Sequence, residues 1–265
     1  MTSSSLKTYF IVLLVIVNLL FIGLVVTDVW DVTSSEALGQ DDLALIYQNS
    51  GVELAEDAYD SKADRLAGGR VTRTGEAELS FTERVLGVGT KAEDRGGSNV
   101  YYIGTNGIAN FRADGYFEIT LPHSSSGGKK SLYAQAEEFA GTLGLKLGKL
   151  STAGRSLSYV LLRGDTEVIN QYVKFEFGIA GGVTISGVYV LGDETETGAY
   201  DYADIFTASL KFLREIEASG ILCGSVTGIK GVYIFESSAY VPAWRFDTDA
   251  GVFILNAISG ELYQE

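Results

Sequence analysis

Cysteine, histidine and proline are all scarce in this chain of 265 residues, and each shortage excludes a class of protein. Cys223 is the one cysteine, so an internal disulfide framework and a site of several thiolates are excluded. The one histidine, His123, excludes zinc sites that need several histidines. Two prolines beside 32 glycines favour hairpins and tight turns over rigid linkers.

Basic residues are also fewer than acidic ones. The chain has 20 basic and 34 acidic residues, a net charge of −14 at pH 7. A protein that binds nucleic acid by electrostatic attraction needs a basic surface to meet the phosphates, so this class is excluded. Hydrophobic residues make up 46% of the chain, which excludes a disordered polypeptide and provides a core for one large or two small domains.

The N-terminal part holds a long apolar run, residues 9–26, in which Asn18 is the one strongly polar residue. With its flanking threonines the run covers residues 8–27, which as a helix would be about 30 Å long and would match the hydrocarbon core of a bilayer. The alternative is a cleaved signal peptide, whose apolar region is shorter and ends in small residues. This run ends without such a site, so we predict a transmembrane helix and lipid contact over residues 8–27.

The flanking charges predict the orientation of this helix. Lys7 precedes it and is the one charged side chain of residues 1–27, whereas Asp28 and Asp31 follow it. The positive-inside rule then makes residues 1–7 a cytoplasmic stub and places residues 28–265 outside the cell membrane. The prediction is a single-pass protein with an acidic extracytoplasmic part.

One face of the predicted helix is a candidate for binding a neighbouring transmembrane helix. An amide in hydrocarbon is costly unless it finds a partner, so Asn18 favours pairing with another helix. The alternatives are that the asparagine is tolerated or faces a second copy of the chain. Residues at helical spacing place five side chains on the candidate partner-binding face: Ile11, Leu14, Asn18, Phe21 and Ile22.

The remainder predicts an α+β fold of antiparallel sheets with helices packed on one face. Apolar residues at helical spacing predict three helices, over 41–50, 131–146 and 201–219. Alternating or β-branched segments between them predict strands: 115–121, 171–177, 183–191 and 231–235. Glycine-containing turns join the strands into hairpins, and such hairpins imply sheets with one covered face.

A helix followed by strands occurs three times, which suggests two compact lobes. The polar segment 123–130, rich in serine and glycine, is the predicted boundary. The first lobe would then cover residues 28–123 and the second residues 131–265.

None of the polar motifs predicts catalysis. No nucleophile motif surrounds His123, and the glycine–lysine run that follows it lacks the spacing of a phosphate-binding loop. Residues 193–204 are rich in acids but lack a calcium-loop pattern, so we interpret them as a solvated loop that leads into a helix. The prediction is a non-enzymatic protein with no catalytic residue, cofactor or metal site.

The C-terminal segment carries the one resemblance to a known family. A strand with Pro242, Trp244 and Arg245 is followed by a second strand that ends in Asn256-Ala-Ile-Ser-Gly260-Glu261. These residues, a predicted structural motif, resemble the end of a PepSY-type module. With the apolar N-terminal segment and its asparagine, the chain is similar to the YycI family of anchored regulators associated with the YycF–YycG (WalR–WalK) two-component system.

This resemblance implies two PepSY-like lobes outside the membrane and a regulatory function. The expected partners are a sensor histidine kinase, whose activity the protein would modulate, and a YycH-like companion protein in the membrane. Cell-wall homeostasis would be the implied physiology. The alternative is an anchored PepSY module that binds or inhibits an extracellular peptidase.

Overall fold

The computed structural model describes residues 40–59, 66–123, 130–197 and 202–265. The chain divides after Leu54 into two compact units. Among the described residues, no helix combines the length and the apolar character that crossing a membrane requires. The predicted transmembrane helix, residues 8–27, lies outside the described part of the chain, as does most of the predicted boundary at 123–130, so both stay predictions.

In the first unit, the described residues form helix α2, Gln40–Asn49, and the short strand β1, Glu53–Leu54. The helix agrees with the prediction from helical spacing, since Leu43 and Tyr47 are buried on one face. Gly51, with φ of +74°, follows the helix, which is the conformation that favours glycine after a helix end.

The second unit contains a long run of antiparallel strands in the order β3-β4-β5-β6-β10-β9-β8-β7. Every neighbouring pair in it is antiparallel, as the hairpin turns predicted. The strands are Lys91–Asp94 (β3), Val100–Ile103 (β4), Ile108–Phe111 (β5), Tyr116–Leu121 (β6), Leu147–Ala153 (β7), Ser156–Arg163 (β8), Thr166–Phe177 (β9) and Val183–Val188 (β10).

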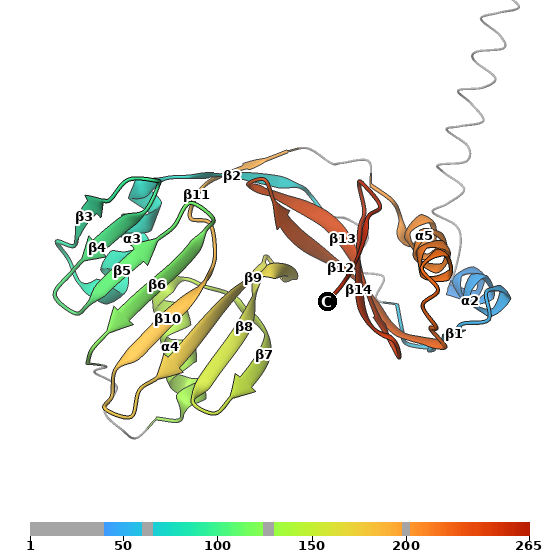
Figure 1. Cartoon of the computed structure of the whole chain (residues 1–265), viewed down its shortest axis with the longest axis horizontal. Coiled ribbons are helices and arrows are strands. Elements are labelled where there is room, and N and C mark those ends of the chain that lie inside the picture. Colours follow the sequence, from blue (N-terminus) through green and yellow to red (C-terminus); the bar gives the residue numbers. More distant parts are fainter. Residues whose placement is uncertain (1–39, 60–65, 124–129, 198–201) are drawn as a thin grey trace, which may run out of the picture. The chain divides into compact units, whose positions relative to one another are not determined.

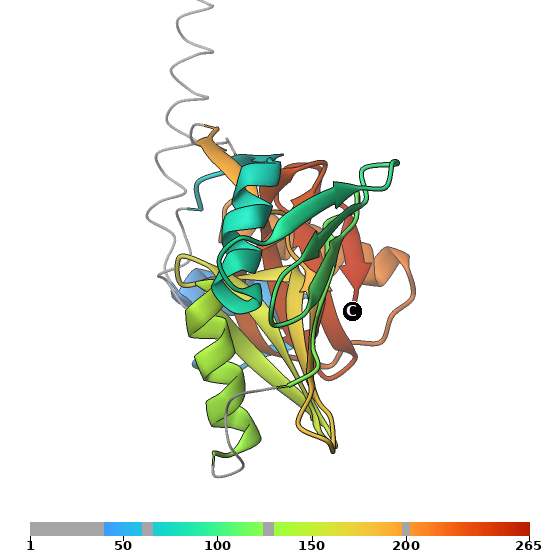
Figure 2. The same ribbon diagram turned by 90° about the vertical axis from the view of Figure 1, so that its left-hand side faces the viewer.

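Two helices, α3 (Gly75–Leu86) and α4 (Leu132–Leu143), lie on the same face of this sheet (Figure 2). Phe81 of α3 and Ala140 of α4 belong to the large apolar core between the helices and the strands. Alternate residues of β9 from Gln171 to Phe177 are buried on the covered face, as the alternating pattern predicted. The opposite face of the strands is more polar, which is usual for an antiparallel sheet with one covered face.

The sheet continues beyond β9 with β12, β13, β2 and β11, while β14 and β15 extend it from β13 (Figure 1). A parallel pairing joins β12 to β9 through Tyr233 and Val168. The strands are Gly69–Arg73 (β2), Gly192–Glu196 (β11), Ser225–Glu236 (β12), Ala239–Thr248 (β13), Gly251–Asn256 (β14) and Leu262–Gln264 (β15).

Helix α5, Ile205–Ala218, covers the C-terminal strands. The side chain of Asp204 caps its first turn by accepting a hydrogen bond from the backbone N–H of Thr207 at 2.7 Å. The ring of Phe212 stacks on the ring of Phe246 in β13, with centroids 4.2 Å apart. The apolar face predicted for residues 201–219 is therefore the face that packs on the sheet.

Among the helices that the structure describes, the sequence pattern missed α3. Its signals are modest: Thr74 caps the N-terminus by accepting from the N–H of Ala77 at 3.4 Å, and acidic residues occupy the first turn. Arg84 lies in the last turn, and Gly87, with φ of +98°, follows the helix. Polar residues interrupt its apolar face, which is why the spacing alone did not identify it.

Candidate functional site

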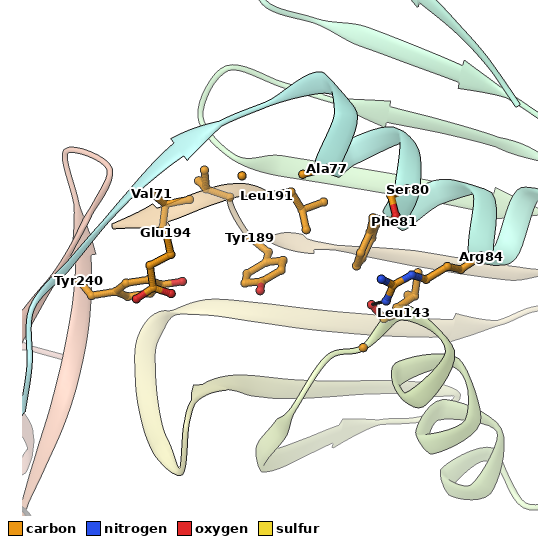
Figure 3. A pocket seen from close by; sticks show the side chains of 13 residues that line it. Val71, Ala77, Ser80, Phe81, Arg84, Leu143, Tyr189, Leu191, Glu194 and Tyr240 are labelled. Carbon is orange, nitrogen blue, oxygen red and sulfur yellow. Dashed lines mark hydrogen bonds between the residues drawn. The ribbon is translucent and has the colours of Figure 1, made fainter. Parts of the chain in front are cut away.

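A cleft of about 320 Å³ lies among α3, the C-terminal end of α4, the segment after β10, and strands β2, β11 and β13 (Figure 3). These elements are distant in the sequence and come together because β11 pairs with β2, which leads directly into α3. The volume is at the lower end of the range that holds small ligands or one or two side chains of a partner.

Three apolar side chains that line the cleft belong to the buried interior of the fold. Phe81 lies 3% exposed in the core and packs edge-on against Phe117, with ring centroids 5.7 Å apart. Leu143 at the end of α4 and Val71 of β2 also line the cleft and are almost fully buried. The surface that the cleft exposes to a ligand is therefore mainly polar.

Arg84 lies at the end of the cleft next to α4. Its Nη1 donates to the backbone oxygen of Leu143 at 2.9 Å, so the guanidinium satisfies a carbonyl at the C-terminus of that helix. None of the ion pairs among the described residues involves Arg84. Its remaining N–H groups can therefore bind a carboxylate or carbonyl of a ligand.

The other end of the cleft holds an ion pair. Arg163, the last residue of β8, donates through Nε and Nη2 to one carboxylate oxygen of Glu194, at 2.8 and 2.6 Å. The guanidinium lies over the rings of both Tyr233 and Tyr240, 4.8 Å from each centroid, and Nη1 donates to the carbonyl of Ala67. This arrangement fixes the hairpin of β8 and β9 to β2, β12 and β13.

Tyr189 and Tyr240 place two phenols beside this ion pair (Figure 3). Burial raises the pKa of Tyr189, and the negative charge of Glu194 raises it further. Burial is also the main cause that raises the pKa of Tyr240 above its usual value. Both phenols are therefore neutral near pH 7 and act as hydrogen-bond groups.

The interpretation of residues 193–204 as a solvated loop is wrong for its first part. Residues Gly192–Glu196 form strand β11, which pairs with β2 in antiparallel register. The sequence pattern did not predict this strand, because most of its side chains are acidic or exposed and it lacks an alternating apolar pattern. Among the described residues, no three histidine, cysteine, aspartate or glutamate side chains gather into a metal site.

The predicted candidate residues lie elsewhere. The transmembrane face of Ile11, Leu14, Asn18, Phe21 and Ile22 is outside the described residues. Pro242, Trp244 and Arg245 lie on β13, and His123 is an exposed residue that does not line the cleft.

The residues of the predicted C-terminal motif hold the last hairpin together. Asn256 ends β14 and accepts hydrogen bonds through Oδ1 from the N–H groups of Ile258 and Ser259, both at 3.0 Å. Its backbone N–H donates to Glu261 at 2.9 Å, and Gly260, with φ of +71°, donates to the oxygen of Asn256 at 2.8 Å. The positive φ explains why glycine occupies this position of the turn.

Arg245 is buried on the face of β13 opposite Trp244. Its Nε donates to Asp247 at 2.9 Å, and its Nη1 lies 3.7 Å from the carboxylate of Glu167. Lys230 on β12 shares that carboxylate at 2.8 Å. The predicted motif residue Arg245 therefore anchors a network of charges that links β9, β12 and β13.

Comparisons with known proteins add little to this geometry. No protein-family model and no curated protein matches the chain. Among solved structures, the Bacillus megaterium YpeB C-terminal domain aligns with 74% of this chain and 98% of that domain, at 10% identity and a TM-score of 0.36. Identity and TM-score are both too low for this similarity to support an inference about fold or function, and none is drawn from it.

Proposed function

We propose that the chain is a membrane-anchored extracytoplasmic protein, similar to the YycI family, that binds a sensor histidine kinase and modulates its activity without being an enzyme. The observation that carries the proposal is the order of segments: a short basic stub, an apolar segment of membrane length with a central Asn18, and an acidic α+β part. A YycH-like companion protein would complete the assembly.

The chemistry of the described residues supports binding. The tyrosines of the cleft are held neutral, and Glu194 is paired with Arg163. Arg84 offers free N–H groups at one end of the cleft. Such a surface suits recognition of a polypeptide through hydrogen bonds.

The anchor is expected to contribute to recognition through Asn18. An interhelical hydrogen bond in a membrane contributes about 0.6–2 kcal/mol, which is enough to bias helix pairing. We expect Asn18→Leu to weaken co-purification with the kinase by about threefold to thirtyfold. Replacement of residues 9–26 by an unrelated apolar span should abolish the dependence of kinase output on this protein.

Both variants should remain in the membrane fraction at the level of the original chain, which serves as the control for anchoring. Output of the kinase, measured by a reporter gene under its response regulator, is the readout. If both variants keep full output and full co-purification, the helix is only a tether, and recognition lies within residues 28–265. Recovery of a peptidase in place of a kinase would favour the alternative function.

A further inference from the structure

Strand β11 forms one end of the described sheet. It pairs with β2 on one side, and among the described residues no strand pairs with its other side. An unpaired strand edge presents backbone N–H and C=O groups that can accept an additional strand. The hydrogen bonds of the neighbouring strand β2 show which residues of β11 offer these groups.

The backbone N–H of Val71 in β2 donates to the oxygen of Ser238, at 2.8 Å, on the side of β13. In an antiparallel sheet, successive residues point their backbone groups to opposite sides, so Arg70 and Thr72 point toward β11. The register pairs Thr72 with Asp193 and Arg70 with Thr195. These two residues of β11 therefore make its bonds to β2.

The residues between them, Gly192, Glu194 and Glu196, must direct their backbone groups to the unpaired edge. Two hydrogen bonds just beyond the ends of β11 agree with this alternation. The N–H of Thr74 donates to the oxygen of Leu191 at 3.2 Å, and the N–H of Thr197 donates to the oxygen of Gly68 at 3.3 Å. Leu191 and Thr197 are odd-numbered positions, like Asp193 and Thr195. The edge thus offers backbone groups on three alternate residues.

The same edge adjoins the cleft. Gly192 and Glu194 both line it, so their side of β11 forms part of its wall (Figure 3). Since side chains alternate along a strand, a segment added next to β11 would place every second side chain on the cleft side. The cleft of about 320 Å³ would receive one or two of them.

Charge identifies the kind of segment. Asp193, Glu194 and Glu196 are exposed, and Glu194 is the one with an ion pair in the described structure. We propose that the edge of β11 binds an extended, lysine- or arginine-containing segment of a partner protein as an additional β-strand, with one or two of its side chains entering the cleft. This binding goes beyond the proposed function, because it does not depend on the partner being a kinase.

Acidic residues on an edge strand also protect it from aggregation, and the test separates that structural role from recognition. The probe is a blocked seven-residue peptide of alternating valine and lysine, titrated by fluorescence anisotropy against the full chain in detergent micelles. The peptide with glutamate in place of lysine is the charge control. We expect the lysine peptide to bind and the glutamate peptide to bind about tenfold more weakly or not at all.

Two substitutions of Glu196 separate the contribution of its backbone N–H to binding from the contribution of its charge. Glu196→Ala removes an exposed carboxylate and keeps the outward N–H, whereas Glu196→Pro removes both and leaves the ladder to β2 intact. Glu196→Pro should bind the peptide about fivefold more weakly than Glu196→Ala, the effect of one lost backbone hydrogen bond. Equal affinity of the two variants would overturn the proposal.

Amide hydrogen exchange on the unaltered chain provides a second measurement that does not depend on the folding of a variant. The amides of Gly192, Glu194 and Glu196 should exchange more slowly when the lysine peptide is added, while exchange at Asp193 and Thr195 is already slow. Unchanged exchange at all three outward amides, with the peptide bound, would place the binding site elsewhere and reject the assignment.

Discussion

Replacing Trp244 by alanine is expected to lower the melting temperature of the chain by about 6–20 °C. The indole is 1% exposed, its Nε1 donates to the backbone oxygen of Ala203 at 2.8 Å, and it pairs in register with Leu255 on β14. Deleting a buried tryptophan commonly costs about 3–5 kcal/mol, and each kcal/mol shifts the melting temperature of a domain of this size by about 2–4 °C.

Leu222→Ala is the matched control, because Leu222 is 94% exposed and should change the stability by less than about 0.5 kcal/mol. Thermal unfolding followed by circular dichroism measures both variants. An unchanged melting temperature for Trp244→Ala, together with lost partner binding, would show that Trp244 acts in an interface rather than in the core.

Replacing Glu78 by alanine is the second change expected to have a large effect, a loss of about 3–5 kcal/mol in the free energy of unfolding. Glu78 is 2% exposed on α3 and pairs with the guanidinium of Arg73, while Tyr102 donates its hydroxyl to the second carboxylate oxygen at 2.9 Å. Removing the carboxylate leaves the side chain of Arg73, which is 23% exposed, without its ion-pair partner.

Glu76→Ala provides the comparison on the same helix, because Glu76 is exposed and its loss should cost no more than about 1 kcal/mol. Tyr102→Phe removes one hydrogen bond to Glu78 and should cost about 1–3 kcal/mol. Urea unfolding of Glu78→Ala, of Tyr102→Phe and of the double variant measures the coupling energy between Glu78 and Tyr102. If Glu78→Ala unfolds at the same urea concentration as Glu76→Ala, the buried pair does not stabilise the fold.

Local patterns predicted much of the architecture. Alternation over residues 171–177 and helical spacing over 201–219 were confirmed by burial, because each depends on neighbouring residues alone. The structure pairs Trp244 with Leu255 and Phe246 with Phe253 across the short turn that joins their strands. Such features require no knowledge of distant parts of the chain.

The cleft could not be predicted in this way. Arg84, Arg163 and Glu194 come from three separate elements, and the pairing of β11 with β2 brings Glu194 toward the others. Helix α3 and strand β11 were both missed, since polar side chains obscure the apolar pattern of each. Without α3 and β11, the sequence analysis could not show that the residues around the cleft lie close together.

Photo-crosslinking in intact membranes tests the central claim most directly. A crosslinking amino acid at position 18 reports on contacts within the membrane, and one at position 196 reports on the edge of β11 outside it. We expect the adduct at position 18 to contain a sensor histidine kinase, identified by mass spectrometry. Recovery of the chain in the soluble fraction without residues 1–27, or adducts that contain only a peptidase, would contradict the account.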